Sequence, residues 1–276
     1  MLIPILQNIL LFFIYSFLGW VCETVYCSIG GRRFVNRGFL NGPLCPVYGF
    51  GALIVVWAMQ PFYKSVLLTF VAGVVLTSIL EYITGWLLET LFHLKLWDYS
   101  ERFLNINGRV CLKNSLMFGI LAVVTVFYIH PLFLKRIRAI PQEWMILLTG
   151  FLLGLLIADL AVTIYTVLKM NGRLKQIQAT AEELYAKAEV LRAELSENTR
   201  RFGEGVQKQM EERREQLSDR LAHLKEKSKN LTYDRPKLLE RRILRAFPHM
   251  RQTLYPYALK KIKKTYIIKI YKCNKK

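Results

Sequence analysis

Four acidic residues lie inside long apolar stretches of this chain, where a carboxylate is costly to place. They are Glu23, Glu81, Glu89 and Asp159. Ionisable side chains inside a membrane usually face protein or water, and they mark ion pathways, substrate pathways or binding sites. We therefore predict a polar path or a binding site at Glu81 and Asp159, which lie deepest. Glu23 and Glu89 come near the ends of their helices, where a carboxylate can also reach the aqueous interface or pair with Arg37 or Arg109.

A second candidate site is the stretch NRGFLNGPLCPVYGFG, residues 36–51, which concentrates turn-forming residues between two apolar runs. Its candidate residues are Asn36, Arg37, Gly38, Asn41, Gly42, Pro43, Cys45, Pro46, Tyr48 and Gly49, joined by Asn107, Gly108 and Cys111 from a similar stretch further along. Asn-Gly forms tight turns, and proline suits the first turn of a helix. Two structures fit: a well-capped helix start, or a short re-entrant turn whose free N–H groups hold an anion beside Arg37.

The similarity between these stretches extends to a repeat of the elements that carry them. GWVCET at 19–24 returns as GWLLET at 85–90, and NGPLC at 41–45 returns as NGRVC at 107–111, each 66 residues later. Two matches at one offset predict a tandem duplication of a two-helix hairpin, with both copies in the same orientation across the membrane. The shared residues then serve either a functional site at the repeat axis or only the packing of the two hairpins.

Hydrophobic residues make up 53% of the 276-residue chain, and they gather in runs long enough to cross a bilayer. The runs are 5–29, 43–60, 65–94, 115–134 and 143–170. We predict an all-α polytopic membrane protein with five transmembrane helices in a domain of residues 1–170, with repeat 1 at about 5–60, repeat 2 at about 65–134 and a fifth helix at 143–170. Loops 30–42 and 95–114 hold more Lys and Arg than the loops on the other side. The positive-inside rule therefore predicts an outside N-terminus and a cytoplasmic C-terminus in the cell membrane.

The remaining residues divide into a predicted coiled coil and a basic tail. Leu174, Ile177, Ala181, Leu184, Ala188, Leu191 and Leu195 follow heptad spacing, and Met210, Leu217, Leu221, Leu224 and Leu231 resume it after two glycines. Residues 171–232 are therefore predicted to form a coiled coil. It is either an antiparallel hairpin that turns at the two glycines or, as we favour, a long parallel dimer that assembles a homo-oligomer. The tail, residues 233–276, holds most of the net charge of +19, and it fits an amphipathic segment on the lipid bilayer better than a nucleic-acid site.

The two quoted stretches also carry a resemblance to a known family. The sequence FFIYSFLGWVCETVY followed by NRGFLNGPLCPVYGFG resembles the CmpB-like, or type IV, group of ABC-transporter permeases, over residues of about 8–170. The resemblance implies a membrane subunit that works with a separate ATPase. It implies no catalytic residues. The chain itself has no G-x-x-x-x-G-K-[ST] sequence for binding ATP.

Two functions are compatible with these features. The first is a membrane transport component that resembles an ABC-transporter permease subunit, favoured by the repeat, the intramembrane acids and the family resemblance. The second is a non-transport scaffold or sensor that assembles through its coiled coil and basic tail. An enzyme is not predicted, because the acids have no histidine or serine partner in the same repeat. The five cysteines lack metal-ligand spacing, so neither a metal site nor a cofactor is predicted.

Overall fold

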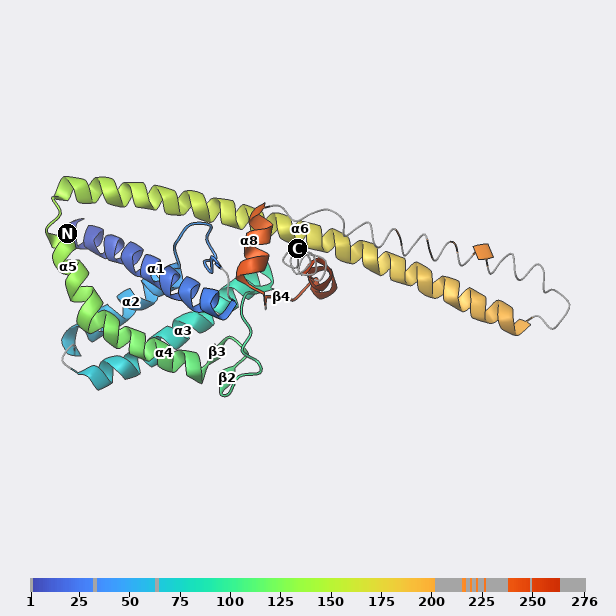
Figure 1. Cartoon of the computed structure of the whole chain (residues 1–276), viewed down its shortest axis with the longest axis horizontal. Helices are drawn as coiled ribbons and strands as arrows, with labels where there is room; N and C mark the ends of the chain where they lie inside the picture. Colours follow the sequence, from blue (N-terminus) through green and yellow to red (C-terminus); the bar gives the residue numbers. More distant parts are fainter. Residues whose placement is uncertain are drawn as a thin grey trace. The chain divides into compact units, whose positions relative to one another are not determined.

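The computed structural model of this chain is dominated by helices (Figure 1). It describes residues 2–31, 34–62, 65–201, 215–216, 219, 222, 226, 238–248 and 250–263. The chain divides into two compact units: residues 1–168 with 238–253, here called the membrane unit, and residues 169–237 with 254–276. In this division residues 238–253 group with residues 1–168, while the predicted coiled coil at 171–232 and basic tail at 233–276 stay predictions.

The membrane unit is built from long apolar helices joined by short connections. Its helices are α1 (Leu2–Gly31), α2 (Pro46–Met59), the 3₁₀ turn η1 (Gln60–Phe62), α3 (Val66–Phe92), α4 (Leu112–Val124), η2 (Thr125–Ile129), α5 (His130–Arg138), the first part of α6 (Gln142–Arg201), and α8 (Leu238–Ala246). Four segments are long and apolar enough to cross a membrane: Leu2–Ile29, Val66–Phe92, Leu112–Arg138 and Gln142–Val190. The protein is therefore an all-α polytopic membrane protein. The predicted second span, 43–60, is a shorter apolar helix that begins at Pro46 and runs to Phe62.

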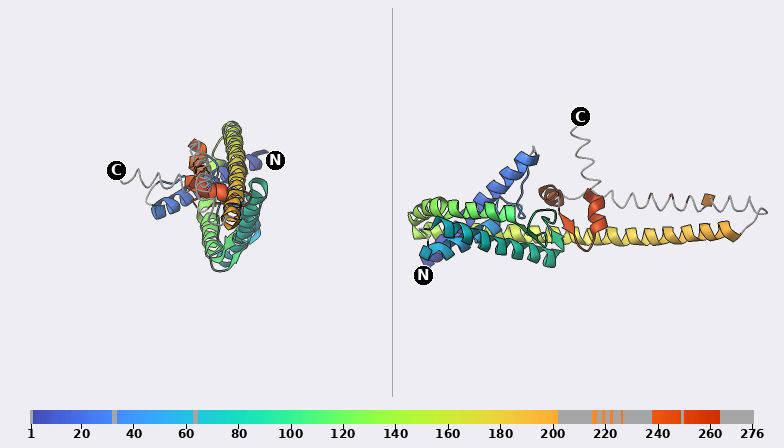
Figure 2. Two further views of the ribbon diagram at one scale, coloured as in Figure 1. Left: turned by 90° about the vertical axis from the view of Figure 1, so that its right-hand side faces the viewer. Right: turned by 90° about the horizontal axis from the view of Figure 1, so that it is seen from below.

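Helices α1 and α2 pack closely because two glycines remove side-chain bulk at their contact. A Cβ added to Gly19 would lie 2.3 Å from Cβ of Tyr48, and one added to Gly49 would lie 2.2 Å from Oγ of Ser16. Small residues allow helix backbones to approach in a membrane, where packing contacts replace the hydrophobic drive. Figure 2 shows α1 running obliquely to α3 and α4.

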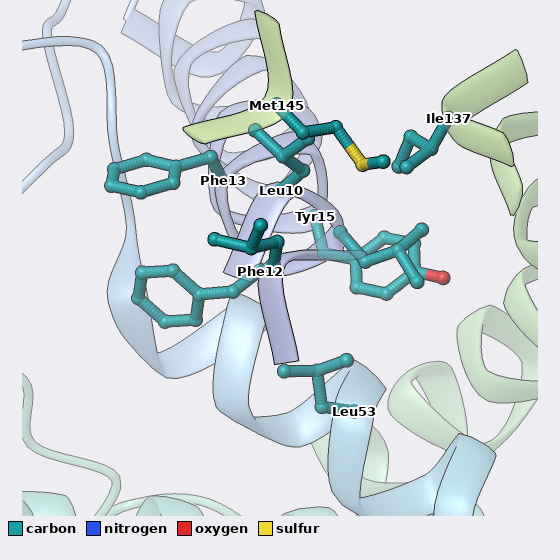
Figure 3. Close-up of a cluster of buried hydrophobic side chains, with 9 residues drawn as sticks. Leu10, Phe12, Phe13, Tyr15, Leu53, Ile137 and Met145 are labelled. Atoms are coloured by element: carbon teal, nitrogen blue, oxygen red, sulfur yellow. The ribbon is translucent and has the colours of Figure 1, made fainter. Parts of the chain in front are cut away.

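A hydrophobic cluster fastens this first hairpin to the later helices of the membrane unit. It contains Leu10, Phe12, Phe13 and Tyr15 from α1, Leu53 from α2, Ile137 from α5 and Met145 from α6 (Figure 3). All of these side chains are buried. The second hairpin, α3 with α4, has its own close contact, where a Cβ on Gly73 would lie 2.4 Å from Cβ of Ala122.

The predicted span 115–134 is a helix with an internal change of form. Residues Thr125–Ile129 make a π-helical turn, η2, directly before His130 and Pro131. Proline has no N–H to donate, and its ring clashes with the carbonyl four residues earlier, so it breaks the α-helical ladder. The π turn is the local adjustment, and α4 and α5 run in different directions on either side of it (Figure 1).

Two small antiparallel strand pairs connect the polar segments of the membrane unit. Strand β2 (Asn105–Ile106) pairs with β3 (Val110–Cys111), and β1 (Leu94–Lys95) pairs with β4 (Arg251–Gln252). The β2–β3 turn contains Asn107 and Gly108, both with positive φ. This turn has the conformation expected for Asn-Gly.

The second unit contains the C-terminal part of α6 and a helical segment at residues 256–263. The predicted heptad positions Leu174, Ile177, Ala181 and Leu184 are buried. Residues 256–263 lie against this stretch, since the Ala258 amide donates to Oε1 of Gln178 and the hydroxyls of Tyr185 and Tyr257 are 3.1 Å apart. The later heptad positions, from Met210 to Leu231, lie outside the described residues, as does the tail after residue 263.

Candidate functional site

The segment after α1 folds back along that helix instead of entering the next span directly. The Cys45 amide donates to the Ser16 carbonyl at 3.0 Å, although α1 continues to Gly31. The fifteen residues of α1 that follow Ser16, up to Gly31, correspond to roughly 22 Å of helix at 1.5 Å per residue. Residues 34–45, here called the motif loop, therefore return to the middle of α1 before α2 begins.

Asn36 satisfies much of the backbone of the motif loop. Its Oδ1 accepts from the Trp20 indole at 2.7 Å and from the Gly38 amide at 3.3 Å, while its Nδ2 donates to the Asn41 carbonyl at 3.1 Å. Irregular backbone at membrane depth is tolerated when protein groups satisfy its polar atoms. Gly38 is buried beside the Trp20 ring, where an added Cβ would lie 3.2 Å from the indole.

Asp159 in α6 holds the Asn-Gly turn of the motif loop. Its Oδ1 accepts from the Asn41 amide and from Asn41 Nδ2, both at 2.9 Å, and its Oδ2 accepts from the Gly42 amide at 2.7 Å. An added Cβ on Gly42 would lie 3.1 Å from Oδ2. The anion held by these loop N–H groups is thus a carboxylate of the chain itself, and Asp159 is engaged in fixing the loop.

Helix α2 begins with a proline in its first turn and without a side-chain cap. Cys45 is the buried N-cap residue and makes no side-chain cap hydrogen bond, and Pro46 occupies the first turn. Pro43 stays exposed in the loop before them. In the second copy Cys111 is likewise the buried N-cap of α4. The two cysteines therefore hold equivalent positions at the starts of α2 and α4.

A cavity of about 500 Å³ opens beside this helix start, between α1, α2, α3, α4 and the motif loop. Most of the lining is apolar. The polar and aromatic groups in the lining include Tyr15, Glu23, Arg37, Cys45, Tyr48, Glu81, Trp97 and Tyr99. Two of the four acids that the sequence singles out, Glu23 and Glu81, are thus brought together by the fold.

Glu23 is held by neighbours from two other segments. Its Oε1 accepts a 2.6 Å hydrogen bond from the Tyr48 hydroxyl, and its Oε2 lies 3.8 Å from Nε of Arg37. Cys27 Sγ lies 4.0 Å from the same Oε2. The Glu23 carboxylate therefore has both a hydrogen-bond donor and an opposite charge.

Glu81 has far less support in the same cavity. Its side chain is 8% exposed, the Tyr99 hydroxyl donates to its carboxyl group, and Oε2 has no hydrogen-bond partner among the described residues. Burial, and then the charges of Glu81 and Glu23, raise the pKa of Tyr99. The phenol therefore stays protonated at neutral pH and remains a donor to Glu81.

Glu89, the repeat equivalent of Glu23, lies away from the cavity and pairs with Arg109. The Glu89 Oε2 atom accepts from Nη2 of Arg109 at 2.7 Å and from Nε at 3.2 Å. Asn107 Nδ2 and Arg109 Nη1 both donate to the Tyr82 hydroxyl. Gly85 faces Arg109 at an ordinary contact distance of 3.5 Å, so the tight glycine contact of the first copy is not repeated in the second.

A segment from the predicted basic tail also forms hydrogen bonds with the motif loop. Arg242 in α8 donates to the carbonyls of Gly38 at 2.8 Å and Phe39 at 2.7 Å. Arg37 donates to the Ala246 carbonyl and stacks over the Phe247 ring, with 4.8 Å to its centroid. Phe247 also lines the cavity. Residues 238–253, here called the latch, are a part of the site that sequence reasoning missed, because nothing distinguishes Arg242 from the other basic residues of the tail.

Strand β4 and one acid complete the attachment of the latch. The Arg251 Nε atom lies 2.9 Å from Oδ2 of Asp98, and Lys95 Nζ lies 3.2 Å from Oδ1. Burial alone would raise the pKa of Asp98, but hydrogen bonds from Ser100 and the nearby Lys95 lower it. Asp98 therefore stays ionised at neutral pH and can hold both cations.

Comparison with known proteins gives a family for the part of the chain that forms this site. The profile of a family described as "Putative ABC-transporter type IV" matches residues 10–164. No curated protein matches the sequence, and no solved structure matches it. The matched range covers more than half of the chain and contains the motif loop, both hairpins and all four intramembrane acids, whereas the latch lies beyond it. The chain therefore belongs to the ABC-transporter type IV family.

Proposed function

We propose that this protein is the membrane subunit of a transporter and that the cavity beside the motif loop is part of its substrate path. The single observation that carries the proposal is a cavity of about 500 Å³ with Glu23 and Glu81 in its lining, within the membrane unit of an ABC-transporter family member. Ligand pockets commonly have volumes of about 300–1,000 Å³ with a few polar groups in an apolar lining.

The proposed transport unit has five spans, formed by two tandem hairpins and one further helix. The short helix Pro46–Phe62 serves as the second span, because the motif loop completes the distance along α1. The matches of GWVCET with GWLLET and of NGPLC with NGRVC at one offset of 66 residues support a common origin for the hairpins. With the basic loops inside, the N-terminus is outside and the latch lies on the cytoplasmic side.

Energy for this transport comes from a separate ATPase, and the subunit is not itself an enzyme. The chain has no phosphate-binding loop of the P-loop type, so hydrolysis must occur on a partner. Its coiled coil and basic tail serve self-association and attachment to the inner leaflet. Affinity purification in a mild detergent should recover a P-loop ATPase in a fixed ratio to this chain.

Access to Cys45 tests whether the cavity belongs to a path that opens on both sides. We would replace Cys22, Cys27, Cys111 and Cys273 by serine and label the remaining Cys45 with a small, membrane-impermeant methanethiosulfonate. Right-side-out and inside-out native vesicles would be compared with and without Mg·ATP. We expect labelling from both sides, with ATP changing the ratio of the two rates.

A second variant that keeps only Cys111 is the matched control. Cys111 is also a buried helix N-cap, but it does not line the cavity, so its labelling should stay slow from both sides. If Cys45 reacts from one side alone under every condition, the cavity is not a translocation path. That result would favour the non-transport alternative, a scaffold or sensor that assembles through its coiled coil and tail.

A further inference from the structure

We propose that the cavity binds an organic monocation, a protonated amine with an apolar body, and that Glu81 is the residue that receives the ammonium group. The inference deepens the proposed function, since it takes the substrate path as given and names the class of substrate. It depends on three features of the cavity: a carboxyl group without an ion pair, the free oxygen of that Glu81 group and the aromatic side chains around it.

The strongly ionisable groups of the cavity lining are not all paired. There are three of them in the lining: Glu23, Arg37 and Glu81. Arg37 lies 3.8 Å from Glu23 and balances it, while Glu81 has no ion pair within the described residues. When Glu81 is ionised, its negative charge therefore has no counter-charge in the lining. A buried carboxyl group in an apolar environment is stabilised either by taking up a proton or by pairing with a cation.

The hydrogen bonds around Glu81 indicate which kind of cationic group can pair with it. Tyr99 already donates to the carboxyl group, while Oε2 has no partner among the described residues. Protonation of Glu81 would remove its charge, so a proton and a bound cation compete for this carboxyl group. An ammonium group supplies both the positive charge and an N–H donor, and a charge-assisted hydrogen bond of this kind is stronger than a neutral one.

The rest of the lining suits an apolar body attached to that ammonium group. Tyr15, Tyr48, Trp97, Tyr99 and Phe118 line the cavity with Glu81, among aliphatic side chains. Aromatic faces attract cations and also pack against apolar groups. A small inorganic cation would leave most of this surface without a contact, and a polar metabolite such as a sugar would find few hydrogen-bonding partners.

The test uses dansylcadaverine, a primary amine with an aromatic body, and the purified full-length protein in lipid nanodiscs. Its fluorescence would report saturable binding, and its N-acetyl derivative would serve as the matched uncharged probe. We expect saturable binding of the amine only. Removing one partner of a buried charge pair should weaken binding at least about tenfold in Glu81→Gln, whereas Glu101→Gln, which alters an exposed loop acid, should leave it unchanged.

Labelling of the wild-type protein covers the case in which Glu81→Gln does not fold. Dicyclohexylcarbodiimide modifies carboxyl groups in apolar sites, and mass spectrometry would follow the adduct at Glu81. Dansylcadaverine should slow this modification, while the acetylated probe should not. Equal binding or equal protection by both probes, or no saturable binding of the amine, would overturn the proposal. The Cys45 labelling experiment requires no ligand. A negative result for amine binding would therefore not decide the transport proposal, which the Cys45 experiment tests separately.

Discussion

At the scale of single residues, the acids inside the membrane unit have different roles. Asp159 accepts three hydrogen bonds from Asn41 and Gly42, and Glu23 and Glu89 each face an arginine. These three carboxylates are stabilised by the chain itself. Glu81 alone among the four has a buried oxygen without a hydrogen-bond partner in the described structure. Acids inside the membrane unit are thus stabilised to different extents, according to what surrounds them.

Replacing Asp159 by asparagine should destabilise the membrane unit through the motif loop. The amide has one acceptor oxygen, so either the Asn41 donors or the Gly42 amide would face an NH₂ group. Leaving a buried donor unpaired costs about 1–3 kcal/mol, and thermal unfolding in detergent should show a lower midpoint for Asp159→Asn. Glu143→Gln, in the exposed first turn of the same helix, is the control and should shift the midpoint little. Equal unfolding midpoints for the two variants would contradict the stabilising role of the hydrogen bonds from the motif loop to Asp159.

At the scale of elements, the two hairpins use glycine differently despite their matching sequences. Gly19 lies against Tyr48 of the neighbouring helix, whereas Gly85 lies against Arg109 and Trp97 from the segments that follow α3. The tight contacts of the second hairpin are at Gly73 and Gly119, on the faces where α3 and α4 meet. An equivalent position in sequence is therefore not an equivalent position in packing.

This difference predicts unequal effects of the same substitution. In Gly19→Ala the new methyl group would lie 2.3 Å from Tyr48 Cβ, so α1 and α2 must separate, and we expect a loss of about 1–3 kcal/mol. In Gly85→Ala the nearest atom is at 3.5 Å, and α-helix propensity favours alanine over glycine, so stability should be unchanged or slightly higher. Unfolding midpoints of both variants in one detergent check the order. The reverse order would show that Gly19 is not at a close helix contact.

The latch predicts a local effect of Arg242→Ala. Its guanidinium donates to the carbonyls of Gly38 and Phe39, and hydrogen bonds that involve a charged group contribute about 1.5–3 kcal/mol, equivalent to about tenfold or more in a local opening constant. Amide hydrogen exchange in residues 238–253 should accelerate accordingly. Leu238→Ala, at an 80% exposed position of the same helix, is the control. If the two variants exchange alike, Arg242 does not hold the latch.

At the scale of the whole molecule, the family region and the latch come from different parts of the sequence. The matched residues 10–164 provide the cavity, and residues 238–253 contribute Phe247 to its lining. The predicted orientation places the loops near the latch in the cytoplasm. The proposed use of a cytoplasmic ATPase depends on that orientation, which can be tested independently of transport.

Cysteine accessibility in a cysteine-free background tests the topology. Phe62→Cys should react with an impermeant maleimide in intact cells, because five spans place η1 outside. Phe103→Cys, in the loop between α3 and α4 and 79% exposed, should react only after the membrane is permeabilised. The opposite pattern would invert the proposed orientation, and reaction of both residues in intact cells would exclude it.

The sequence by itself determined the helical membrane character, most helix positions and the family, because these properties depend on local apolar runs and on a contiguous motif. Glu23 and Glu89 could also be assigned arginine partners from nearby loops. The tertiary structure alone decided that Asp159 holds a loop 118 residues earlier and that Arg242 holds carbonyls more than 200 residues earlier. It also decided that the motif loop folds back to Ser16 and that Glu81 faces the cavity with a free oxygen. The physical reason is that the sequence shows which side chains are polar and need a partner when they are buried. Which partner each of them finds depends on which distant segments pack against it.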